Sequence, residues 1–495
     1  MNYQSSIPEK VLIIGSGIGG LSTAIILAKL GAEVTVLEKN QNPGGLMRSY
    51  SRDGIDCEVG VHYLGSLAQG QILRKFFDYL GVTGSIPVTR MGSNGVIDRY
   101  LFNSSANKPT VFDLPEGMEA FAENLKQTFP AETNKISKIV EPIRQAARQL
   151  HGLDLLYAEQ NDLSLLDQAR PLGEILNDLQ CSPGLRSVLA VPSCWIGVPL
   201  DDCPAFYHNM ALASYVSSSW RLNGSGADMA DVLARRLEEL GGKIITGAEI
   251  ERIHVSSRVV TGVQVKSGES LTAATVIGAL HPKIILNMLP EGAVKPSYRQ
   301  RISNLKDTHG IFSVHIKLDA DAHPEIPYNI FKLDTDKFGN VPDLRYYQIR
   351  KSKKAGVNLL SILTSGKDQL WAPWQKTKSG RRGGDYLEAK EGHAQQLVHE
   401  AEGLFGPLHG CKILDAYTPL TMRDWVNTPG GSAYGVQRSS SQMLATALLN
   451  RTSVKGLYLV GQNVMAPGII GTILASFSTV KLILGATEFK KAIRL

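Results

Sequence analysis

The chain has 495 residues, of which 43% are hydrophobic and 20% are charged, and its formal net charge is +6. Single hydrophobic cores rarely grow past about 250 to 300 residues, so we expect two or more lobes. The small net charge, with no long Lys/Arg run interleaved with aromatic residues, gives nucleic-acid binding little support. The five cysteines form no CxxC pair and are odd in number, which favours reduced thiols and a cytoplasmic location.

The N-terminal segment has the pattern of a strand, a glycine-rich turn, a helix and a second strand. In chain order the parts are a strand at 11–14, the glycines Gly15, Gly17 and Gly20, a helix at 21–30 and a strand at 34–37. The first glycine of this GxGxxG spacing permits a tight turn, the second lets backbone amides approach a pyrophosphate, and the third lets the helix pack against the strand. The helix directs its N-terminal dipole at the same anion.

Glu38 ends the second predicted strand. At this position a carboxylate accepts hydrogen bonds from an adenosine ribose and disfavours a 2′-phosphate. The complete unit therefore predicts a dinucleotide site rather than a glycine-rich turn without a ligand. The unit alone leaves both nicotinamide and flavin dinucleotides open.

A second glycine pair and an arginine follow in NQNPGGLMRSYSRDGIDCEVGVHYLG, residues 40–65. This stretch resembles the flavoproteins with two dinucleotide-binding domains, in which an acid on the second strand is followed by a glycine pair, a basic residue that reaches the cofactor, and a D-x-G sequence. Here the matching residues are Gly44, Gly45 and Arg48, with Glu58-Val59-Gly60 in place of D-x-G. The resemblance implies FAD, and no histidine or cysteine stands in a recognisable flavin-linking context, so non-covalent binding is expected. The alternative for Arg48 is a solvated surface charge.

Two later segments extend the same resemblance. GLYLVGQNVMAPGIIGTILASFSTVKLILG, residues 456–485, reads as a strand, a glycine-containing loop and a helix that begins near Gly471. In the resembled proteins this helix N-terminus points at the flavin, where exposed amides and the helix dipole favour negative charge. Gln462 stands where many relatives have an acid. In residues 225–280 the resemblance places Glu249 and Ile250 beside the adenine, although Ile250 also fits a purely structural strand.

The resemblance implies an α/β fold, with a discontinuous Rossmann-like FAD-binding domain and an inserted α+β substrate-binding lobe. The expected domains are 1–90, 221–300 and 410–495 for FAD, and 91–220 and 301–409 for the substrate. The residues expected at the cofactor are Gly15, Gly17, Ile18, Gly19, Gly20, Glu38, Lys39, Gly44, Gly45, Leu46, Arg48, Gly60, Val61, His62, Ile250, Gly461, Gln462, Gly468, Ile469, Ile470 and Gly471.

Three stretches narrow the resemblance within these flavoproteins. EVGVHYLG at 58–65, TPLTMRDWVNTPGGSAYG at 418–435 and GQNVMAPGIIG at 461–471 are similar to the branch that contains phytoene desaturases, carotenoid isomerases and retinol saturases. The resemblance implies an FAD-dependent oxidoreductase that reduces, desaturates or isomerises C=C or C–C bonds of a lipophilic polyene or isoprenoid, such as a carotenoid or retinoid. Electrons would pass to or from a quinone, O₂ or an external reductant. His62, Tyr63 and Tyr434 are the candidates for the catalytic pocket.

Two other functions stay open at this point. One is a flavin-dependent amine or porphyrinogen oxidase of the same fold, which an aromatic cage facing the flavin would favour. The other is a non-catalytic flavin-binding redox partner. His62 also fits a satisfied packing histidine, and Tyr434 also fits a core or lid tyrosine. The sequence has no HExxH, GxSxG or P-loop motif and no clustered metal-ligand spacing, so no metal site is expected.

The substrate lobe contains two apolar stretches, 189–200 and 205–216, that either line an apolar tunnel or fill the core. A helix is predicted at 386–405 from its apolar face. The basic loop 375–385 and the C-terminal segment 489–495 are expected to hold the protein peripherally on an anionic membrane, the alternative for the loop being a solvated, flexible segment. We expect no transmembrane span.

Overall fold

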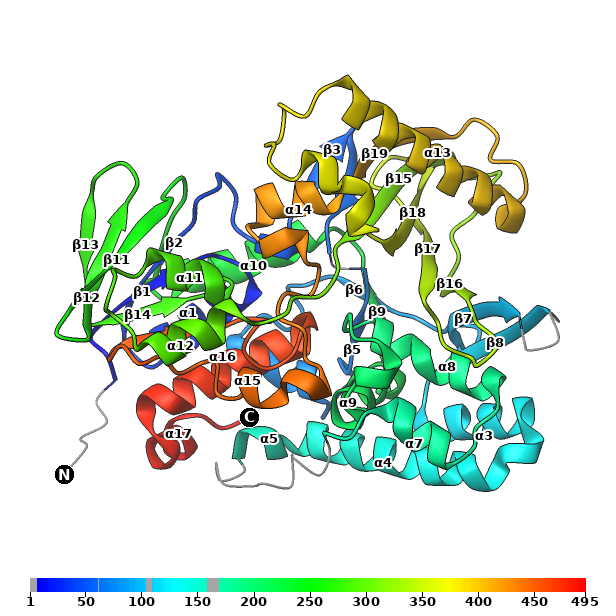
Figure 1. Ribbon diagram of the computed structural model, residues 1–495, viewed down its shortest axis with the longest axis horizontal. Coiled ribbons are helices and arrows are strands. Elements are labelled where there is room, and N and C mark those ends of the chain that lie inside the picture. Colours follow the sequence, from blue (N-terminus) through cyan, green and yellow to red (C-terminus); the bar gives the residue numbers. More distant parts are fainter. Residues whose placement is uncertain (1–6, 61, 104–108, 158–168) are drawn as a thin grey trace.

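The computed structural model describes residues 7–60, 62–103, 109–157 and 169–495 of the chain. These residues form two lobes, each built around its own large sheet (Figure 1). The smaller parallel sheet lies on the left in Figure 1, and the larger, mainly antiparallel sheet lies on the right beneath the long helix α13 (Gly384–Phe405). The expected α/β fold is confirmed.

The parallel sheet joins strands from three distant parts of the chain. In spatial order they are β10 (Lys243–Ile245), β2 (Glu33–Leu37), β1 (Lys10–Ile14), β14 (Thr275–Gly278) and β20 (Leu457–Leu459). Every neighbouring pair is parallel, and Ile14 at the end of β1 lies opposite Leu37 of β2 and Gly278 of β14. Ligands of such sheets bind beyond the carboxyl ends of the strands, so this edge positions the site.

Three helices pack around this sheet: α1 (Ile18–Lys29), α10 (Gly226–Glu239) and α16 (Gly468–Leu484). The prediction that the first helix begins at residue 21 is wrong, because α1 begins inside the glycine motif. A Cβ on Gly20 would lie 2.0 Å from the carbonyl oxygen of Gly15, and one on Gly19 would lie 2.8 Å from Cα of Gly461. Glycine at these positions lets α1 pack directly on β1 and on the start of the C-terminal segment. In the same way α16 begins at Gly468, ahead of the expected Gly471.

Three small sheets complete the cofactor side and its junction with the other lobe. The first is the antiparallel sheet β11 (Ile250–Ser256), β12 (Val259–Val265) and β13 (Ser270–Thr272), which confirms the expected hairpin strands. The second is the hairpin β3 (Ser49–Arg52) and β4 (Ile55–Glu58). The third is the sheet β5 (Leu64–Gly65), β9 (Ser219–Leu222) and β6 (Val88–Arg90).

The seven-stranded sheet separates a helix-covered face from a face that turns towards the cofactor lobe. Its order is β19 (Lys412–Tyr417), β15 (Ile311–Asp319), β18 (Val357–Ser365), β17 (Asp343–Lys351), β16 (Asn329–Asp334), β7 (Val96–Asn103) and β8 (Pro109–Pro115). Successive side chains of a strand point to opposite faces. Thus Tyr347 and Ile349 of β17 pack in one cluster with Leu397 of α13, whereas Tyr346, Gln348 and Arg350 belong to the other face.

The remaining helices lie on either side of these sheets (Figure 1). They are α2 (Ile72–Leu80), α3 (Met118–Thr128), α4 (Thr133–Gly152), α5 (Asp154–Tyr157), α7 (Leu172–Asp178), α8 (Pro183–Cys194), α9 (Ala205–Ser217), α11 (Pro282–Met288), α12 (Pro296–Ser303), α14 (Pro419–Val426), α15 (Met443–Thr446) and α17 (Ala486–Ala492). The predicted helix at 386–405 is confirmed as α13. The expected domain boundaries stay a prediction, and the boundary at 410 precedes β19, which pairs with β15 of the seven-stranded sheet.

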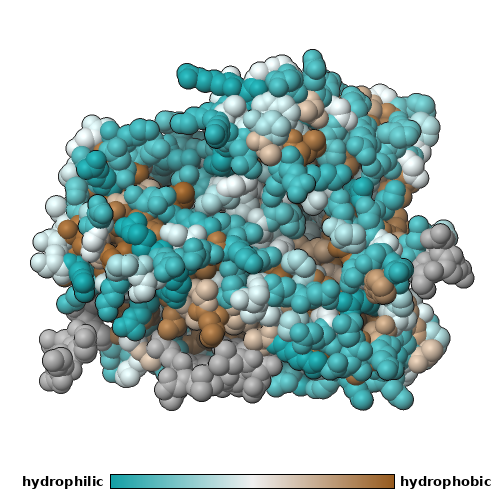
Figure 2. Space-filling model, viewed as in Figure 1, coloured by the Kyte–Doolittle hydropathy of each residue, from teal (hydrophilic) through white to brown (hydrophobic). Residues whose placement is uncertain are grey.

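Within the described residues, no single helix is long and apolar enough to cross a membrane. Only α16 and α17 taken together reach that length, and they are bent by 118° relative to each other. The face drawn in Figure 2 is mostly hydrophilic, with hydrophobic side chains scattered over it.

Candidate functional site

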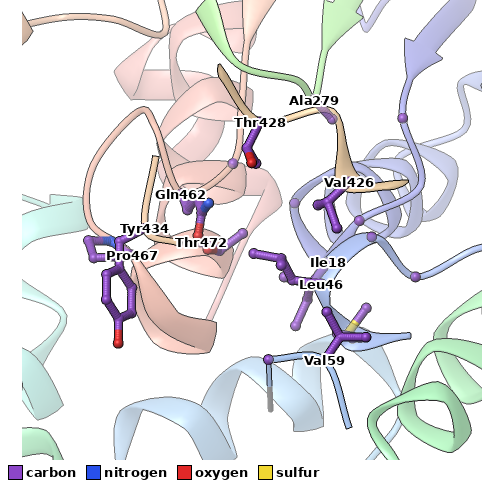
Figure 3. Close-up of a pocket in the computed structure, with 18 of the residues that line it drawn as sticks. Ile18, Leu46, Val59, Ala279, Val426, Thr428, Tyr434, Gln462, Pro467 and Thr472 are labelled. Carbon is purple, nitrogen blue, oxygen red and sulfur yellow. The ribbon is translucent and has the colours of Figure 1, made fainter. Parts of the chain in front are cut away.

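A cavity of about 430 Å³ lies beyond the carboxyl ends of the parallel strands. Residues from the N-terminal segment and from the C-terminal third of the chain face one another across it (Figure 3). Ile18, Leu46 and Val59 come from the first group, and Gln462, Pro467 and Thr472 come from the second. The cavity therefore collects segments that are more than 400 residues apart in the sequence, as 18 and 462 illustrate.

The glycine-rich loop forms one wall through its backbone. Gly15 has φ +101°, a left-handed conformation that glycine adopts without strain. Gly17 precedes the first turn of α1, and no side chain caps this helix. The first amides of α1 therefore have no side-chain acceptor, and such a helix N-terminus attracts an anion.

The second glycine pair lies directly against the first loop. The amide of Gly44 donates to the carbonyl of Ser16 at 3.0 Å, and a Cβ on Gly45 would lie 3.0 Å from Cα of Gly17. Arg48 lies at the cavity wall and donates from Nη2 to the carbonyl of Trp425 at 2.7 Å. Arg48 is therefore no freely solvated charge, which removes the alternative considered for it.

Glu38 is buried and also lines the cavity. Its Oε2 accepts from the amide and hydroxyl of Ser16 at 3.1 and 2.6 Å, and its Oε1 accepts from the amide and side chain of Asn40 at 2.9 and 2.7 Å. Burial favours the neutral acid, but these hydrogen bonds outweigh it and hold the pKa of Glu38 below its usual value. A carboxylate offers about four lone-pair sites, so a further donor such as a ribose hydroxyl must share or replace one of these bonds.

The C-terminal wall repeats the design of the N-terminal one. Gly461 and Gly468 have φ +108° and +82°, and α16 also begins without a side-chain cap, after Pro467. The two residues in the place of the expected acid differ in role. Both line the cavity, but Asn463 is also buried and accepts a hydrogen bond from the amide of Val436 at 2.8 Å.

Most of the residues expected at the cofactor line this one cavity. They are Gly15, Gly17, Ile18, Gly19, Glu38, Lys39, Gly44, Gly45, Leu46, Arg48, Gly60, His62, Ile250, Gly461, Gln462, Gly468, Ile469 and Ile470. Gly20 and Gly471 do not line it but let helices pack closely, since a Cβ on Gly471 would lie 2.5 Å from the carbonyl oxygen of Ala466. Val61 lies outside the described residues.

His62 borders the cavity and has an unusual environment. Both of its ring nitrogens are buried and have no hydrogen-bond partner. Burial, together with the nearby His315 and Arg350, lowers the pKa of His62 to about 3. The imidazole is therefore neutral at physiological pH, and it is not the satisfied packing histidine considered from the sequence.

Tyr63 and Tyr434 also line the cavity. Tyr63 belongs to a ring cluster, with its centroid 4.8 Å from that of Tyr215, 6.2 Å from that of Tyr346 and 6.5 Å from that of Trp195. Burial raises the pKa of Tyr63 and of Tyr434 above the usual value, so both phenols stay protonated. The structure thus brings the three pocket candidates to one cavity.

The two apolar stretches of the substrate lobe contribute to both the cavity and the core. From 189–200 the cavity takes Trp195 and Ile196, and from 205–216 it takes Ala211, Ser214 and Tyr215. Residues such as Leu189, Val191, Leu212 and Val216 belong to the core. Trp195 and Tyr215 were not named individually from the sequence, because a buried aromatic residue in an apolar run looks the same in a core and in a pocket.

A buried polar cluster that no sequence pattern predicts lies behind the aromatic rings. Asp98 accepts from the hydroxyl of Tyr215 at 2.8 Å and from Nδ2 of Asn329 at 2.9 Å. Oδ1 of Asn329 accepts from the hydroxyl of Tyr346 and from Nε2 of Gln348, both at 3.1 Å. Burial raises the pKa of Asp98 to about 8, although the hydrogen bonds from Tyr215 and Asn329 oppose the shift. No sequence motif marks this polar cluster, because its residues come from four separate elements.

The basic loop 375–385 is attached to α14 rather than free. Arg382 pairs with Asp424 at 2.5 Å with only 6% of its side chain exposed, and Arg423 donates to the carbonyls of Gln375 and Thr377. The expectation that Arg382 is available to a lipid surface is therefore wrong. Lys376, Lys378 and Arg381 of the same loop are exposed.

Comparisons with known proteins agree with this arrangement. A family model described as flavin containing amine oxidoreductase matches residues 18–483. An all-trans-retinol 13,14-reductase of Macaca fascicularis is 26% identical over 95% of this chain and 85% of its own length. A protein of Danio rerio described as an inactive all-trans-retinol 13,14-reductase is 24% identical over 94% of this chain and 84% of its own length. A 4,4'-diaponeurosporene oxygenase of Staphylococcus aureus is 26% identical over 54% of this chain and 55% of its own length.

Solved structures show the same fold. A putrescine oxidase bound to putrescine superimposes with a TM-score of 0.64 at 15% identity, covering 98% of this chain and 99% of that chain. At this identity the likeness concerns the fold alone.

Proposed function

The chain belongs to the flavin-containing amine oxidoreductase family and is a flavin-dependent oxidoreductase, and from this premise we propose that it binds FAD non-covalently and reduces a C=C bond of a lipophilic polyene. The observation that carries the proposal is the single cavity that joins a glycine-built dinucleotide cradle to a pocket lined by aromatic and apolar side chains. The direction is chosen because the relatives that cover 94–95% of the chain are described as retinol reductases.

The cradle fits a flavin adenine dinucleotide. Two helices, α1 and α16, begin at the cavity without side-chain caps, and a Cβ on Gly45 would press against the backbone of Gly17. Glu38 and the neighbouring Ala248 and Ile250 would hold the adenosine end. The described lining contains His62 and His281 but no cysteine, so a covalent link to the flavin would have to involve one of these histidines.

A bound flavin supplies hydride transfer in either direction. The chain's own contribution is to hold a double bond against it and to exclude water. Tyr63 and Tyr434 keep their hydroxyl protons, and neutral His62 keeps one ring N–H, since burial shifts the pKa of each away from ionisation. One of these three groups would supply the proton that the reduced substrate carbon takes up.

Specific features favour a polyene over an amine as the substrate. The rings of Tyr63, Trp195 and Tyr215 form the kind of aromatic wall that also suits an amine oxidase. A cationic amine, however, needs a carboxylate partner when it is buried. Among the described lining residues the only carboxylates are Glu38 and Glu249, both next to Ala248 at the adenosine end. A non-catalytic role is the remaining alternative. It is supported by one relative that is itself described as inactive.

Turnover separates these functions. The purified protein, supplied with an external reductant, should convert a conjugated polyene into a product two mass units heavier, detected by mass spectrometry. The same protein should not oxidise putrescine or other amines. Amine oxidation without polyene turnover would establish the oxidase alternative, and no turnover by a flavin-loaded protein would favour the non-catalytic one.

We also propose a cytoplasmic protein that associates peripherally with an anionic membrane. The exposed Lys376, Lys378 and Arg381 lie in a loop attached to α14, and Trp425 at the end of α14 is 54% exposed while it borders the cavity. Basic residues contribute about 1 kcal/mol each near an anionic surface, and tryptophan favours the interface. Sedimentation with anionic liposomes should decrease as salt rises. Replacing all three basic residues with glutamine should weaken it further, whereas wild-type protein that ignores such liposomes at low salt would refute the proposal.

A further inference from the structure

A second, polar cavity of about 500 Å³ lies between the sheet β5-β9-β6 and the strand β17. Its lining carries four cationic side chains, Arg90, Arg221, Arg350 and Lys351, against two carboxylates, Glu58 and Glu325. None of these six residues lines the flavin-side cavity. The family resemblance and the proposed reaction therefore give this cavity no role.

The positive charges that line this cavity are not all paired with carboxylates of the protein. Arg90 pairs with Glu116 at 3.0 Å, outside the lining, and Lys351 lies 4.0 Å from Glu325. Arg350 pairs with Glu58 at 3.0 Å. Once these pairs are made, the charge of the fourth cation is left without a carboxylate.

That fourth cation is Arg221, which is 8% exposed. It donates to the carbonyl of Ile326 and to Oδ1 of Asn329, both neutral, and its Nε–H has no partner. In the described part of the chain Arg221 makes no ion pair. Asp98 belongs to the same polar cluster, and the charge of Arg221 lowers its pKa, but burial outweighs this effect and raises the pKa of Asp98 to about 8. A buried, uncompensated guanidinium is costly unless an anion reaches it.

Arg350 is a second guanidinium whose charge and hydrogen bonds are only partly satisfied by the protein. Its Nη2 donates to Glu58 and to the carbonyl of Asp56, while its Nε–H is buried without a partner. Burial raises the pKa of Glu58 to about 7 in spite of Arg350, so this carboxylate is only partly ionised near neutral pH. Guanidinium groups bind carboxylates through paired, charge-assisted hydrogen bonds.

His62 lies between the two cavities, since it is among the residues that line each of them. Gln348, which also lines the polar cavity, fixes the backbone here by donating to the carbonyl of His62 at 3.2 Å. An elongated molecule that reaches past His62 would place its apolar chain in the first cavity and its polar end in the second.

We propose that the polar cavity binds a carboxylate, and that this carboxylate is the terminal group of the polyene whose chain lies on the flavin side. Arg221 and Arg350 hold the carboxylate, and His62 lies beside the point where the chain passes between the cavities. The polyene part of this proposal rests on the proposed function. The anion site does not, because it rests on Arg221 and Arg350. It narrows the substrate class to polyene acids, as opposed to hydrocarbons, alcohols or esters.

The test compares a polyene acid with its methyl ester, which has the same chain and no charge. Dissociation constants are measured on the flavin-loaded protein by titration, and KM is measured where turnover occurs. The wild type should bind the acid about 10- to 100-fold more tightly than the ester, as expected for charge-assisted hydrogen bonds. The replacements Arg221→Gln and Arg350→Gln should abolish this preference, through a higher KM for the acid and not for the ester.

The control is Arg345→Gln, on the same strand β17 but on the face covered by α13. Its exposure matches that of Arg350, at 13% against 14% of the side chain, and it also loses an ion pair, with Glu400 at 3.0 Å. It should retain the preference for the acid. Arg221→Lys, which keeps the charge, should retain part of it even if Arg221→Gln folds poorly.

Two further measurements distinguish a carboxylate at the end of a chain from a small free anion. A saturated fatty acid of equal length should compete with the polyene acid in the wild type and should fail to do so in Arg350→Gln, which tests the anion site even if no polyene is turned over. Equal binding of acid and ester by the wild type would overturn the proposal. So would binding of acetate or inorganic phosphate as tight as that of the acid, because the site would then take a free anion and not the end of a chain.

Discussion

The glycine-rich wall and the aromatic wall of the flavin-side cavity are built from different parts of the polypeptide. The first wall works through its backbone, because Gly15, Gly17 and Gly45 bring amides and helix ends close together. The second works through side chains such as Tyr63 and Tyr215, which reach the cavity from separate elements. The comparison teaches that the first wall has no room for an added methyl group at positions such as Gly20. The second wall depends instead on the shape of its side chains and on the buried polar cluster behind them.

Adding one methyl group to the glycine wall should give the largest effect. In Gly20→Ala the new Cβ would lie 2.0 Å from the carbonyl oxygen of Gly15, so α1 must move away from β1. We expect a loss of about 3 kcal/mol or more in the free energy of unfolding, measured in denaturant, and little bound flavin. The control Gly392→Ala, on the exposed face of α13 with nothing within 4 Å, should be neutral or slightly stabilising. Equal stability of the two variants would contradict this account of the wall.

Glu38→Ala should have the next largest effect on the same wall. The ribose would lose charge-assisted hydrogen bonds worth about 1.5 to 3 kcal/mol, which corresponds to a roughly 10- to 150-fold weaker affinity for FAD. Ser16 and Asn40 would also lose their acceptor, so part of the loss should appear as reduced stability of the apoprotein. FAD titration of the apoprotein and denaturant unfolding measure the two effects separately. An unchanged affinity for FAD would mean that the ribose binds elsewhere.

The polar cluster behind the aromatic wall should show itself in the pH dependence of stability. The pKa of Asp98 is raised to about 8 in the folded protein, well above the value of an exposed aspartate. Between about pH 4 and pH 8 the unfolded chain has released this proton while the folded protein retains it, so stability falls as pH rises through this range. Asp98→Asn should remove up to about 1.4 kcal/mol per pH unit from that slope. A slope identical to that of the wild type would show that Asp98 is ionised in the fold.

The smallest effect is expected at Tyr63, where the ring and the hydroxyl can be separated. Tyr63→Phe keeps the contacts with Tyr215 and Tyr346, and we expect its kcat/KM to stay within about 10-fold of the wild type, whereas loss of a true general acid costs about 100- to 10,000-fold. Tyr63→Ala opens the wall and should raise KM more than it lowers kcat. A loss of 100-fold or more in Tyr63→Phe, with binding unchanged, would instead assign the catalytic proton to this hydroxyl.

The contrast between the glycine-rich wall and the aromatic wall also explains which parts of the site could be predicted from the sequence. The strands and helices around the glycine motif, and the residues Glu38, Gly44 and Gly468 at one cavity, follow from short local patterns that repeat a known geometry. The start of α1 differs from the prediction because a glycine-rich stretch indicates a turn, whereas Gly19 and Gly20 lie within the helix.

The polar residues behind the aromatic wall could not be predicted in the same way. Asp98, Asn329 and Arg221 lie on three strands that meet only in the folded chain, and each alone reads as an ordinary polar residue. Their burial, and the pairing that decides their charge, depend on the register of the seven-stranded sheet.

The central claim is that hydride moves between a bound flavin and a C=C bond of a polyene. The most direct measurement is anaerobic photoreduction of the flavin-loaded protein, followed by rapid mixing with a conjugated polyene while the flavin spectrum and the product mass are recorded. The account predicts that the oxidised flavin spectrum returns as a product two mass units heavier forms in equal amount. A reduced flavin that stays reduced with every polyene tested, combined with an oxidised flavin that amines reduce, would contradict it.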